Sequence, residues 1–330
     1  MKEYCKIILL SGLLFFSLPV TAQEVTLNEF IDEMVTRHHF DRAQMIDWFT
    51  QAKVRKNILK LMAPPKTTGK ITPWYRYRPR FVNEKRIAEG VEFWQQHAST
   101  LARAQATYGV PAEIIIAIIG VETIYGQNMG DFRVLDALTT LAFHYPRRAD
   151  YFRSELEHFL LLTHEEGVDP LELRGSYAGA MGIGQFMPSS FRQYAVDFDG
   201  DGKRDIWNSM DDAIGSVAHY FNRYGWQAGQ PVMMATQVRP DAIDSLLGLE
   251  FTLRYTLQQL KQQGLLFYAD FIPDTTPGVL VDLETEQGMA YWVGFNNFYV
   301  ITRYNRSNRY AMSVYQLAQE VADRYGQTTY

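Results

Sequence analysis

Glu122 stands at the end of one of the most apolar stretches of the chain, residues 114–121. Pro111 suits the first turn of a helix, so residues 111–122 are predicted to form a helix that is apolar on all sides and therefore buried. Apolar surroundings disfavour an ionised carboxylate, and so does the negative end of the helix dipole. Both effects raise the pKa of Glu122 towards the range of a general acid at neutral pH. A solvated or paired glutamate is the ordinary alternative.

The segment 197–203 (DFDGDGK) follows the pattern of a calcium loop. Ca²⁺ takes oxygen ligands from positions one, three and five and a backbone carbonyl from position seven, with glycine at position six. Position twelve is Asn208 instead of the usual glutamate, so the closing carboxylate must come from further along the chain, and Asp211 or Asp212 could supply it. A bound ion would be structural, because a shell filled with protein oxygens leaves little room for substrate. The alternative is a turn that binds no metal.

A glycine-rich segment, residues 175–189, is the third candidate. Four glycines within residues 175–184 are too many for a helix and favour a hairpin or tight loop. Glycines let the backbone approach a ligand closely, and Ser176 and Gln185 offer neutral hydrogen-bonding groups for sugars and amides. The alternative is a tightly packed hairpin that contains glycines only because larger residues would not fit.

The first 22 residues are predicted to be a secretory signal peptide. A short charged start, a mostly apolar segment at 7–19 and the small-residue site Val20-Thr21-Ala22 follow the usual order. The single cysteine, Cys5, precedes the apolar segment, so we expect no disulfide and no lipid-anchored cysteine in the mature chain. No later segment approaches the roughly 20 apolar residues of a membrane span. We therefore expect a soluble periplasmic protein with no transmembrane span.

Composition limits the partners of this protein. Its net charge is −5 and it has no basic run, so nucleic acid and anionic membranes are poor partners. The segment Gly182-Ile183-Gly184 lacks the third glycine of a dinucleotide loop, and no organic cofactor is expected. The 20 tyrosines belong mostly to the core, but their excess also suits a surface that stacks on sugar rings. We expect a monomer.

The elements that must position these residues are mainly helical. A capping box at Thr26 and Glu29 opens the first helix, and Asp41 with Gln44 opens the second. Residues 63–77 contain three prolines and are expected to form an irregular connecting arm. Further helices are predicted at 83–109 (one helix or a pair), 111–122, 134–143, 148–162, from 188, at 212–224, 256–263 and 310–325, and strands at 232–238, 251–255 and 279–283.

Four motifs in a fixed order closely resemble the lytic murein transglycosylase B family, over about residues 77–325. The match is weaker across the strand-containing segment. The motifs are Gly120-Val121-Glu122-Thr123, the glycine-rich segment, the aspartate loop and the segment at 297–305.

The resemblance implies a mainly α (α+β) fold, in which a lysozyme-like core carries a helical subdomain and a small inserted β subdomain. The expected divisions are a signal peptide at 1–22, an N-terminal helical subdomain and connecting arm at 23–79, the catalytic core at 80–225, a β-containing insertion at 226–290 and the C-terminal part of the core at 291–330. The core would include a helical excursion at about 144–174 and the calcium loop at 197–212.

The resemblance further implies cleavage of the MurNAc–GlcNAc β-1,4 bond of peptidoglycan glycan strands, with Glu122 as the single catalytic acid/base. The positions that match the family's glycan-binding residues are Ser176, Gln185, Tyr77, Tyr151, Tyr220, Tyr304, Asn305 and Tyr310. Those that match its calcium ligands are Asp197, Asp199, Asp201, the Lys203 carbonyl and Asp212.

No second acidic residue is tied to Glu122 by a motif, whereas ordinary glycosidases use two carboxyl groups. We therefore expect Glu122 to protonate the glycosidic oxygen while the substrate's N-acetyl group stabilises the charge at C1. The muramic C6 hydroxyl then attacks C1 and a 1,6-anhydro ring forms. The alternatives are a hydrolytic muramidase with a second carboxylate opposite Glu122, and a non-catalytic peptidoglycan-binding protein.

Overall fold

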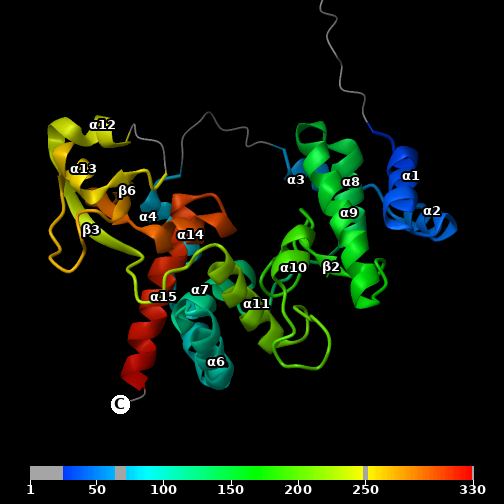
Figure 1. Ribbon diagram of the computed structural model, residues 1–330, viewed down its shortest axis with the longest axis horizontal. Coiled ribbons are helices and arrows are strands. Elements are labelled where there is room, and N and C mark those ends of the chain that lie inside the picture. Colours follow the sequence, from blue (N-terminus) through cyan, green and yellow to red (C-terminus); the bar gives the residue numbers. More distant parts are fainter. Residues whose placement is uncertain (1–24, 64–71, 248–251, 329–330) are drawn as a thin grey trace, which may run out of the picture. The chain divides into compact units, whose positions relative to one another are not determined.

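The computed structural model describes residues 25–63, 72–247 and 252–328, in two compact units that meet in sequence at Met45 and Ile46 (Figure 1). The predicted signal peptide at 1–22 and the first residue of the strand predicted at 251–255 lie outside the described residues. In the first unit, α1 (Leu27–His38) begins with the predicted capping box, since Thr26 and Glu29 each bond the other's backbone N–H. The boundary falls within α2 (Arg42–Gln51).

The second unit is built around α7 (Ala112–Thr123), which confirms the predicted buried helix. Ile115, Ile116, Ile118 and Ile119 are fully buried, because helices cover α7 on several sides. Figure 1 shows α7 among α6, α11 and α15. The helices that pack on it are α5 (Glu84–Gln96), α6 (Ala98–Tyr108), α11 (Met210–Arg223) and α15 (Asn308–Thr328).

A second group of helices precedes and surrounds the glycine-rich segment. It comprises α3 (Lys56–Leu61), α8 (Val134–His144), η2 (Pro146–Arg148), α9 (Ala149–Glu166) and α10 (Pro188–Tyr194). The buried carboxylate of Asp136 on α8 ties the segment before α3 to this group, since it pairs with the guanidinium of Arg55 at 2.8 Å and accepts the backbone N–H of Lys53. Helix α9 extends four residues beyond its predicted end at 162.

The glycine-rich segment forms the tight loop that the sequence predicts. Strand β2 (Arg174–Gly175) pairs antiparallel with β1 (Phe132–Arg133), and isolated bridges then join Gly175 to Met181 and Met181 to Phe186. The loop is therefore fastened to the segment that follows α7, which places it near Glu122.

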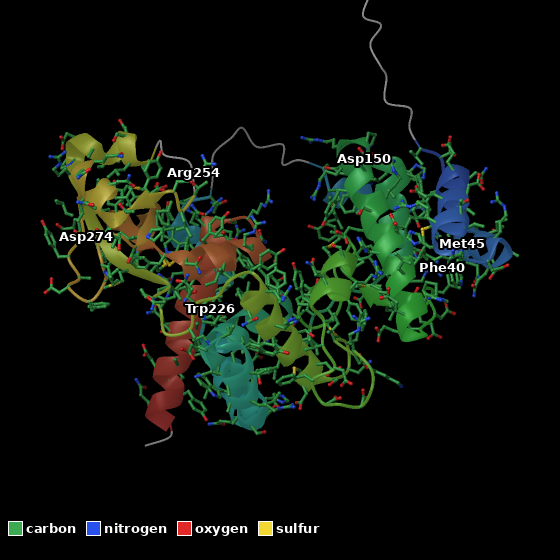
Figure 2. All side chains as sticks on the ribbon, in the orientation of Figure 1. Phe40, Met45, Asp150, Trp226, Arg254 and Asp274 are labelled. Atoms are coloured by element: carbon green, nitrogen blue, oxygen red, sulfur yellow. The ribbon has the colours of Figure 1, made fainter. Side chains whose placement is uncertain are left out.

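A five-stranded antiparallel sheet with strand order β4-β6-β7-β3-β5 follows Trp226, which is labelled in Figure 2. Its core is formed by Leu257, Leu260, Leu280 and Val293. The predictions of β3 and β6 are confirmed, but β5 and β7 are missing from the predicted set. The strand predicted at 251–255 is wrong at 252–254, which form a bend and a turn, because only Tyr255 and Thr256 pair with β6. The strands are β3 (Met233–Val238), β4 (Tyr255–Thr256), β5 (Leu265–Leu266), β6 (Pro277–Thr285) and β7 (Gly288–Gly294), and the helices between and after them are η3 (Pro240–Ala242), α12 (Ile243–Leu247), α13 (Leu257–Gln262) and α14 (Asn296–Tyr304).

The prediction that residues 63–77 form no element is wrong at the end of the arm. Pro73 serves as the N-cap of a short helix, α4 (Trp74–Tyr77), which η1 (Arg78–Arg80) continues. Helix α4 forms because Trp74, only 5% exposed, is buried where α4 packs on β6. This helix brings Tyr77, which is half-buried, to the guanidinium of Arg309 at the start of α15.

Within the described ranges, no single helix is long and apolar enough to cross a membrane. In the part of the chain that the structure describes, one pair of helices, α6 with α7, reaches that length and composition together, and the pair is bent by 113°.

Candidate active site and calcium loop

Glu122 occupies the last turn of α7 and is half-buried. The hydroxyl of Tyr310 donates a hydrogen bond to its Oε1 atom at 2.5 Å. Burial raises the pKa of Glu122 to about 7, and the Tyr310 hydroxyl opposes that rise because it stabilises the carboxylate. Among the described residues no other carboxylate is a cause of the shift. Glu122 is therefore an acid that can both give and take a proton near neutral pH.

Three tyrosines face the Glu122 carboxylate, and we call Glu122, Tyr77, Tyr304 and Tyr310 the Glu122 cluster. Burial, and in addition the charge of Glu122, raises the pKa of each of the three phenols. Tyr310 is only 3% exposed, and Tyr304 donates to the carbonyl of Gly184 at 2.5 Å. These hydroxyls stay protonated at neutral pH and can donate hydrogen bonds.

Tyr220 packs against the Glu122 cluster through Tyr304. Its ring lies 4.7 Å from the ring of Tyr304, centroid to centroid, and its hydroxyl donates to the carbonyl of Arg303 at 2.8 Å. It is 5% exposed, so the structure places it as a packing partner of Tyr304.

The backbone just after Glu122 is held in an unusual conformation. Ile124 and Tyr125 have positive φ angles of 53° and 57°, which are rare for residues with a Cβ atom and rarest for a β-branched one. Thr123, fully buried, secures this turn: its hydroxyl accepts the N–H of Gly126 at 2.9 Å and donates to the carbonyl of Ile183 at 2.8 Å. Strain of this kind persists only where the surroundings enforce it.

Ser176 and Gln185 lie in the glycine-rich segment, which the Thr123 hydroxyl contacts through its hydrogen bond to Ile183. The Ser176 hydroxyl oxygen accepts the N–H of Ala180 at 3.0 Å, and the Gln185 side-chain amide donates to the carbonyl of Met129 at 3.0 Å. The backbone of Gln185 is left-handed, with φ at 52°. A Cβ atom at Gly130 would lie 2.3 Å from the carbonyl oxygen of Gly175, so the two segments approach as closely as glycine allows.

Tyr151 and Asn305 are not joined to the Glu122 cluster by contacts among the described residues. Tyr151, 37% exposed on α9, has the Arg148 guanidinium 4.1 Å from its ring centroid and interacts with Glu155. Asn305 is exposed and follows α14, directly after Tyr304.

Two residues of the site have no role in the sequence-based prediction. Thr123 belongs to a quoted motif, and a hydroxyl directly after a buried acid is the signal that could have singled it out. Tyr125 gives no such signal. Its hydroxyl reaches the carbonyl of Arg86 at 2.8 Å, and its ring fills the space that a Cβ atom would need at Gly120.

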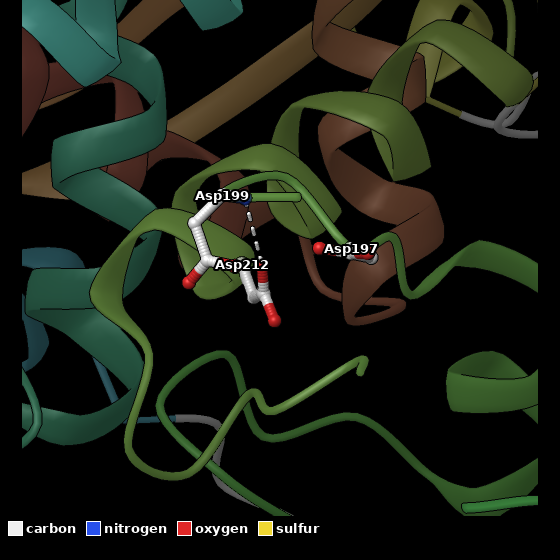
Figure 3. A group of neighbouring side chains, drawn as sticks. All are labelled: Asp197, Asp199 and Asp212. Carbon is white, nitrogen blue, oxygen red and sulfur yellow. Dashed lines mark hydrogen bonds between the residues drawn. The ribbon is translucent and has the colours of Figure 1, made fainter. Parts of the chain in front are cut away.

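The aspartate loop brings together Asp197, Asp199 and Asp212, each with a carboxylate oxygen within 4.8 Å of the other two. Figure 3 shows the group and the hydrogen bond from the Asp199 N–H to Asp212. Asp211 points elsewhere, since it accepts the Thr100 hydroxyl at 2.8 Å and pairs with Arg103. The geometry thus favours Asp212 over Asp211 as the closing residue.

The donor set of the loop fits a hard divalent cation. Three carboxylates this close repel one another unless positive charge lies between them, and all their donors are oxygens. Asp201 is outside this group, and its carboxylate accepts the N–H of Lys203 at 2.9 Å. Gly202, with φ at 91°, makes the turn at position six.

Comparisons with known proteins show the family to which the chain is similar. Residues 22–319 match the transglycosylase SLT domain family. The membrane-bound lytic murein transglycosylase B of Escherichia coli (strain K12) is 47% identical over 309 residues, which span 91% of this chain and 84% of that protein. The soluble lytic transglycosylase SltB1 from Pseudomonas aeruginosa superposes with a TM-score of 0.86 at 48% identity, over 90% of this chain and 98% of that one. The E. coli lytic transglycosylase Slt35, solved in complex with calcium, superposes with a TM-score of 0.80 at 47% identity, over 90% of this chain and 93% of that one.

Proposed function

This chain belongs to the transglycosylase SLT family, and from that membership we propose that it is a lytic transglycosylase that cleaves the glycan strands of peptidoglycan. The observation that carries the mechanism is the position of Glu122, a half-buried acid with a pKa of about 7 and no carboxylate partner among the described residues. A protonated Glu122 gives its proton to the oxygen of the MurNAc–GlcNAc bond.

The second half of the reaction uses the same side chain as a base. Positive charge at C1 is stabilised by the substrate's N-acetyl group, since no second carboxylate is required for that role. The ionised Glu122 then takes the proton of the muramic C6 hydroxyl, and the C6 oxygen forms a bond to C1. No water is consumed, and Glu122 ends protonated for the next turnover.

The surrounding residues position the acid and the sugar. The Tyr310 hydroxyl stabilises Glu122 in its ionised form, because it donates to Oε1. Tyr77, Tyr304 and Asn305, with Ser176 and Gln185 from the opposite loop, offer hydrogen-bonding groups to the glycan, and Tyr220 holds Tyr304 in place. Tyr151 would contact a part of the strand more distant from the cleaved bond.

We propose that Asp197, Asp199, Asp201, Asp212 and the Lys203 carbonyl hold Ca²⁺. The ion would be structural: it would neutralise the carboxylates and so fix the loop to the start of α11.

We also propose export to the periplasm after cleavage at Ala22, since peptidoglycan lies outside the cytoplasmic membrane, and action as a monomer. The core would comprise residues 80–225 and 291–330, interrupted by the β insertion at 226–290.

Release of soluble fragments from purified peptidoglycan tests the role of Glu122. We expect Glu122→Gln to lower the rate by at least about 100-fold, because glutamine cannot transfer a proton. Glu113→Gln, on the first turn of the same helix, is the matched control and keeps the rate of the unaltered protein. Equal rates for Glu122→Gln and the unaltered protein would contradict the assignment.

A further inference from the structure

The net charge of −5 is unevenly distributed along the chain. Residues 48–63 contain Lys53, Arg55, Lys56 and Lys60 but no aspartate or glutamate, and residues 137–149 likewise contain arginines and no acid. The first stretch includes α3, and the second includes most of α8 and the whole of η2. Where these two stretches lie together, an acidic protein can carry a positively charged surface.

The two stretches are packed against each other. Helix α3 contacts α8, beside which Figure 1 shows it. Just before α3, the N–H of Arg55 donates to the Thr140 hydroxyl at 2.9 Å, and just after it the carbonyl of Met62 accepts the Tyr145 hydroxyl at 3.1 Å. Hydrogen bonds at both ends thus hold this short helix beside α8 and next to the turn that contains η2.

Helix α3 turns one side to α8 and the other to solvent. Ile58 is fully buried, whereas Lys56 and Lys60, one helical turn apart, are exposed. Val54 and Leu61, two large aliphatic side chains, are 50% and 54% exposed among these lysines. The basic surface, as we call it, consists of Lys53, Val54, Lys56, Lys60, Leu61 and the neighbouring Arg147 of η2, all of them exposed.

In the part of the chain that the structure describes, none of the four cations of the basic surface takes part in an ion pair. The carboxylate of Asp136 on α8 is occupied by Arg55 and Arg133. That of Asp150, which Figure 2 labels at the start of α9, is occupied by Arg153. The positive charge of the basic surface is therefore available to an anionic ligand.

The exposed aliphatic side chains indicate what kind of ligand this is. At the surface of a membrane that contains anionic phospholipids, lysine and arginine side chains reach the phosphate groups, and apolar side chains enter the boundary between headgroups and acyl chains. An anionic polymer such as nucleic acid would neutralise the cations but would leave Val54 and Leu61 in water.

We propose that the basic surface binds membranes that contain anionic phospholipids. The four cations contact lipid phosphates, while Val54 and Leu61 enter the headgroup boundary. Because the contacts are few and mostly electrostatic, binding is reversible and sensitive to salt. An exported protein meets the surface of the membrane that it has crossed. The net charge of the whole chain predicts that anionic membranes are poor partners, and the basic surface is the place where that expectation fails.

Co-sedimentation with lipid vesicles tests the proposal. Vesicles made of phosphatidylcholine and phosphatidylglycerol in equal parts are compared with vesicles of phosphatidylcholine alone. We expect the protein to bind the anionic vesicles at low ionic strength, to be released as salt is added, and to bind the zwitterionic vesicles far more weakly. Equal binding to both kinds of vesicle, or none to the anionic kind, would overturn the proposal.

Two variants locate the binding surface. Lys60→Glu should bind the anionic vesicles about 25-fold more weakly, or about fivefold for each unit of charge. Lys85→Glu makes the same change of charge at an exposed position of α5 and is the matched control, which keeps the affinity of the unaltered protein. Leu61→Ser should weaken binding about fivefold while the dependence on salt stays the same. Equal affinities of Lys60→Glu and Lys85→Glu would rule out the basic surface.

The vesicle experiment requires no cleavage, so its outcome is independent of the proposed function. Lys60→Glu should release soluble fragments from purified peptidoglycan at the rate of the unaltered protein, since α3 contributes no residue to the Glu122 cluster. If membrane-free peptidoglycan, and not the anionic vesicles, retained the unaltered protein and failed to retain Lys60→Glu, the basic surface would belong to the polymer and the membrane proposal would be wrong.

Discussion

The Tyr310 hydroxyl and the Glu122 carboxylate meet at 2.5 Å although 188 positions separate them in the chain. The contact exists because α15 packs along α7 and carries Tyr310 to the last turn of that helix. It links the protonation of the acid to the packing of the C-terminal helix.

The pH dependence of cleavage should follow the proton of Glu122. Because the acid must be protonated at the first step, kcat/KM should fall as pH rises through about 7. Tyr310→Phe removes a hydrogen bond that lowers the pKa of Glu122, so that pKa should rise and the falling limb should move to higher pH. A pH–rate profile of the variant decides the matter: an unmoved limb, or one moved to lower pH, would contradict the role given to Tyr310.

The free energy of unfolding should also depend on pH, and the raised pKa of Glu122 sets the direction of that dependence. The folded protein holds the Glu122 proton more tightly than the unfolded chain does. The stabilising effect is thus complete below the ordinary value of 4.5 and is lost as pH rises through about 7. Glu122→Gln lacks this dependence, so relative to the unaltered protein it should gain up to about 3 kcal/mol in free energy of unfolding between pH 4.5 and pH 8.5.

Urea unfolding at the two pH values measures that difference. Glu92→Gln, at an exposed position of α5, is the control and should show no comparable gain. A difference between Glu122→Gln and the unaltered protein that does not change with pH would mean that the Glu122 pKa is not raised.

Thr123 should prove to be a positioning residue. Thr123→Val keeps the shape of the side chain but loses the hydrogen bonds to Ile183 and Gly126. We expect a loss of about 1–3 kcal/mol in unfolding free energy, since buried groups are left unpaired, together with a lower kcat. Thr123→Ser keeps the hydroxyl and should recover most of kcat. If the serine variant were as impaired as the valine variant, the hydroxyl would not be the feature that matters.

Calcium should stabilise the folded chain. Chelation should lower the Tm and added Ca²⁺ should restore it, because the ion binds the folded loop and not the unfolded chain. Asp199→Asn should abolish the response, whereas Asp211→Asn, whose carboxylate contacts Thr100 and Arg103, should keep it. A Tm that responds to neither treatment in the unaltered protein would leave the loop as a turn without a metal.

Local patterns in the sequence predict much of this fold. The capping box at Thr26, the buried helix that ends at Glu122 and the hairpin of the glycine-rich segment each depend on residues close together in the chain. For the same reason the direction of the Glu122 pKa shift is predictable, since the burial that raises this pKa comes from the apolar helix that carries the residue.

Long-range packing is what the sequence does not reveal. No spacing rule brings Tyr77, Tyr304 and Tyr310 to one carboxylate, and only the family resemblance points to them. Strand β7 is missed because residues 288–294 mix glycine, methionine and alanine with aromatic residues, and their extended form depends on pairing with β3 and β6. Helix α4 is missed because Trp74 gains its helical turn from burial against β6.

Mass spectrometry of the products formed in ¹⁸O-labelled water tests the central claim most directly. Residues 23–330 are incubated with purified peptidoglycan, and the released muropeptides are weighed before and after borohydride reduction. We predict 1,6-anhydro products, one water lighter than reducing sugars, free of ¹⁸O and inert to borohydride. Products that carry ¹⁸O at a reducible end would show that water attacks C1, and would contradict the transglycosylase mechanism.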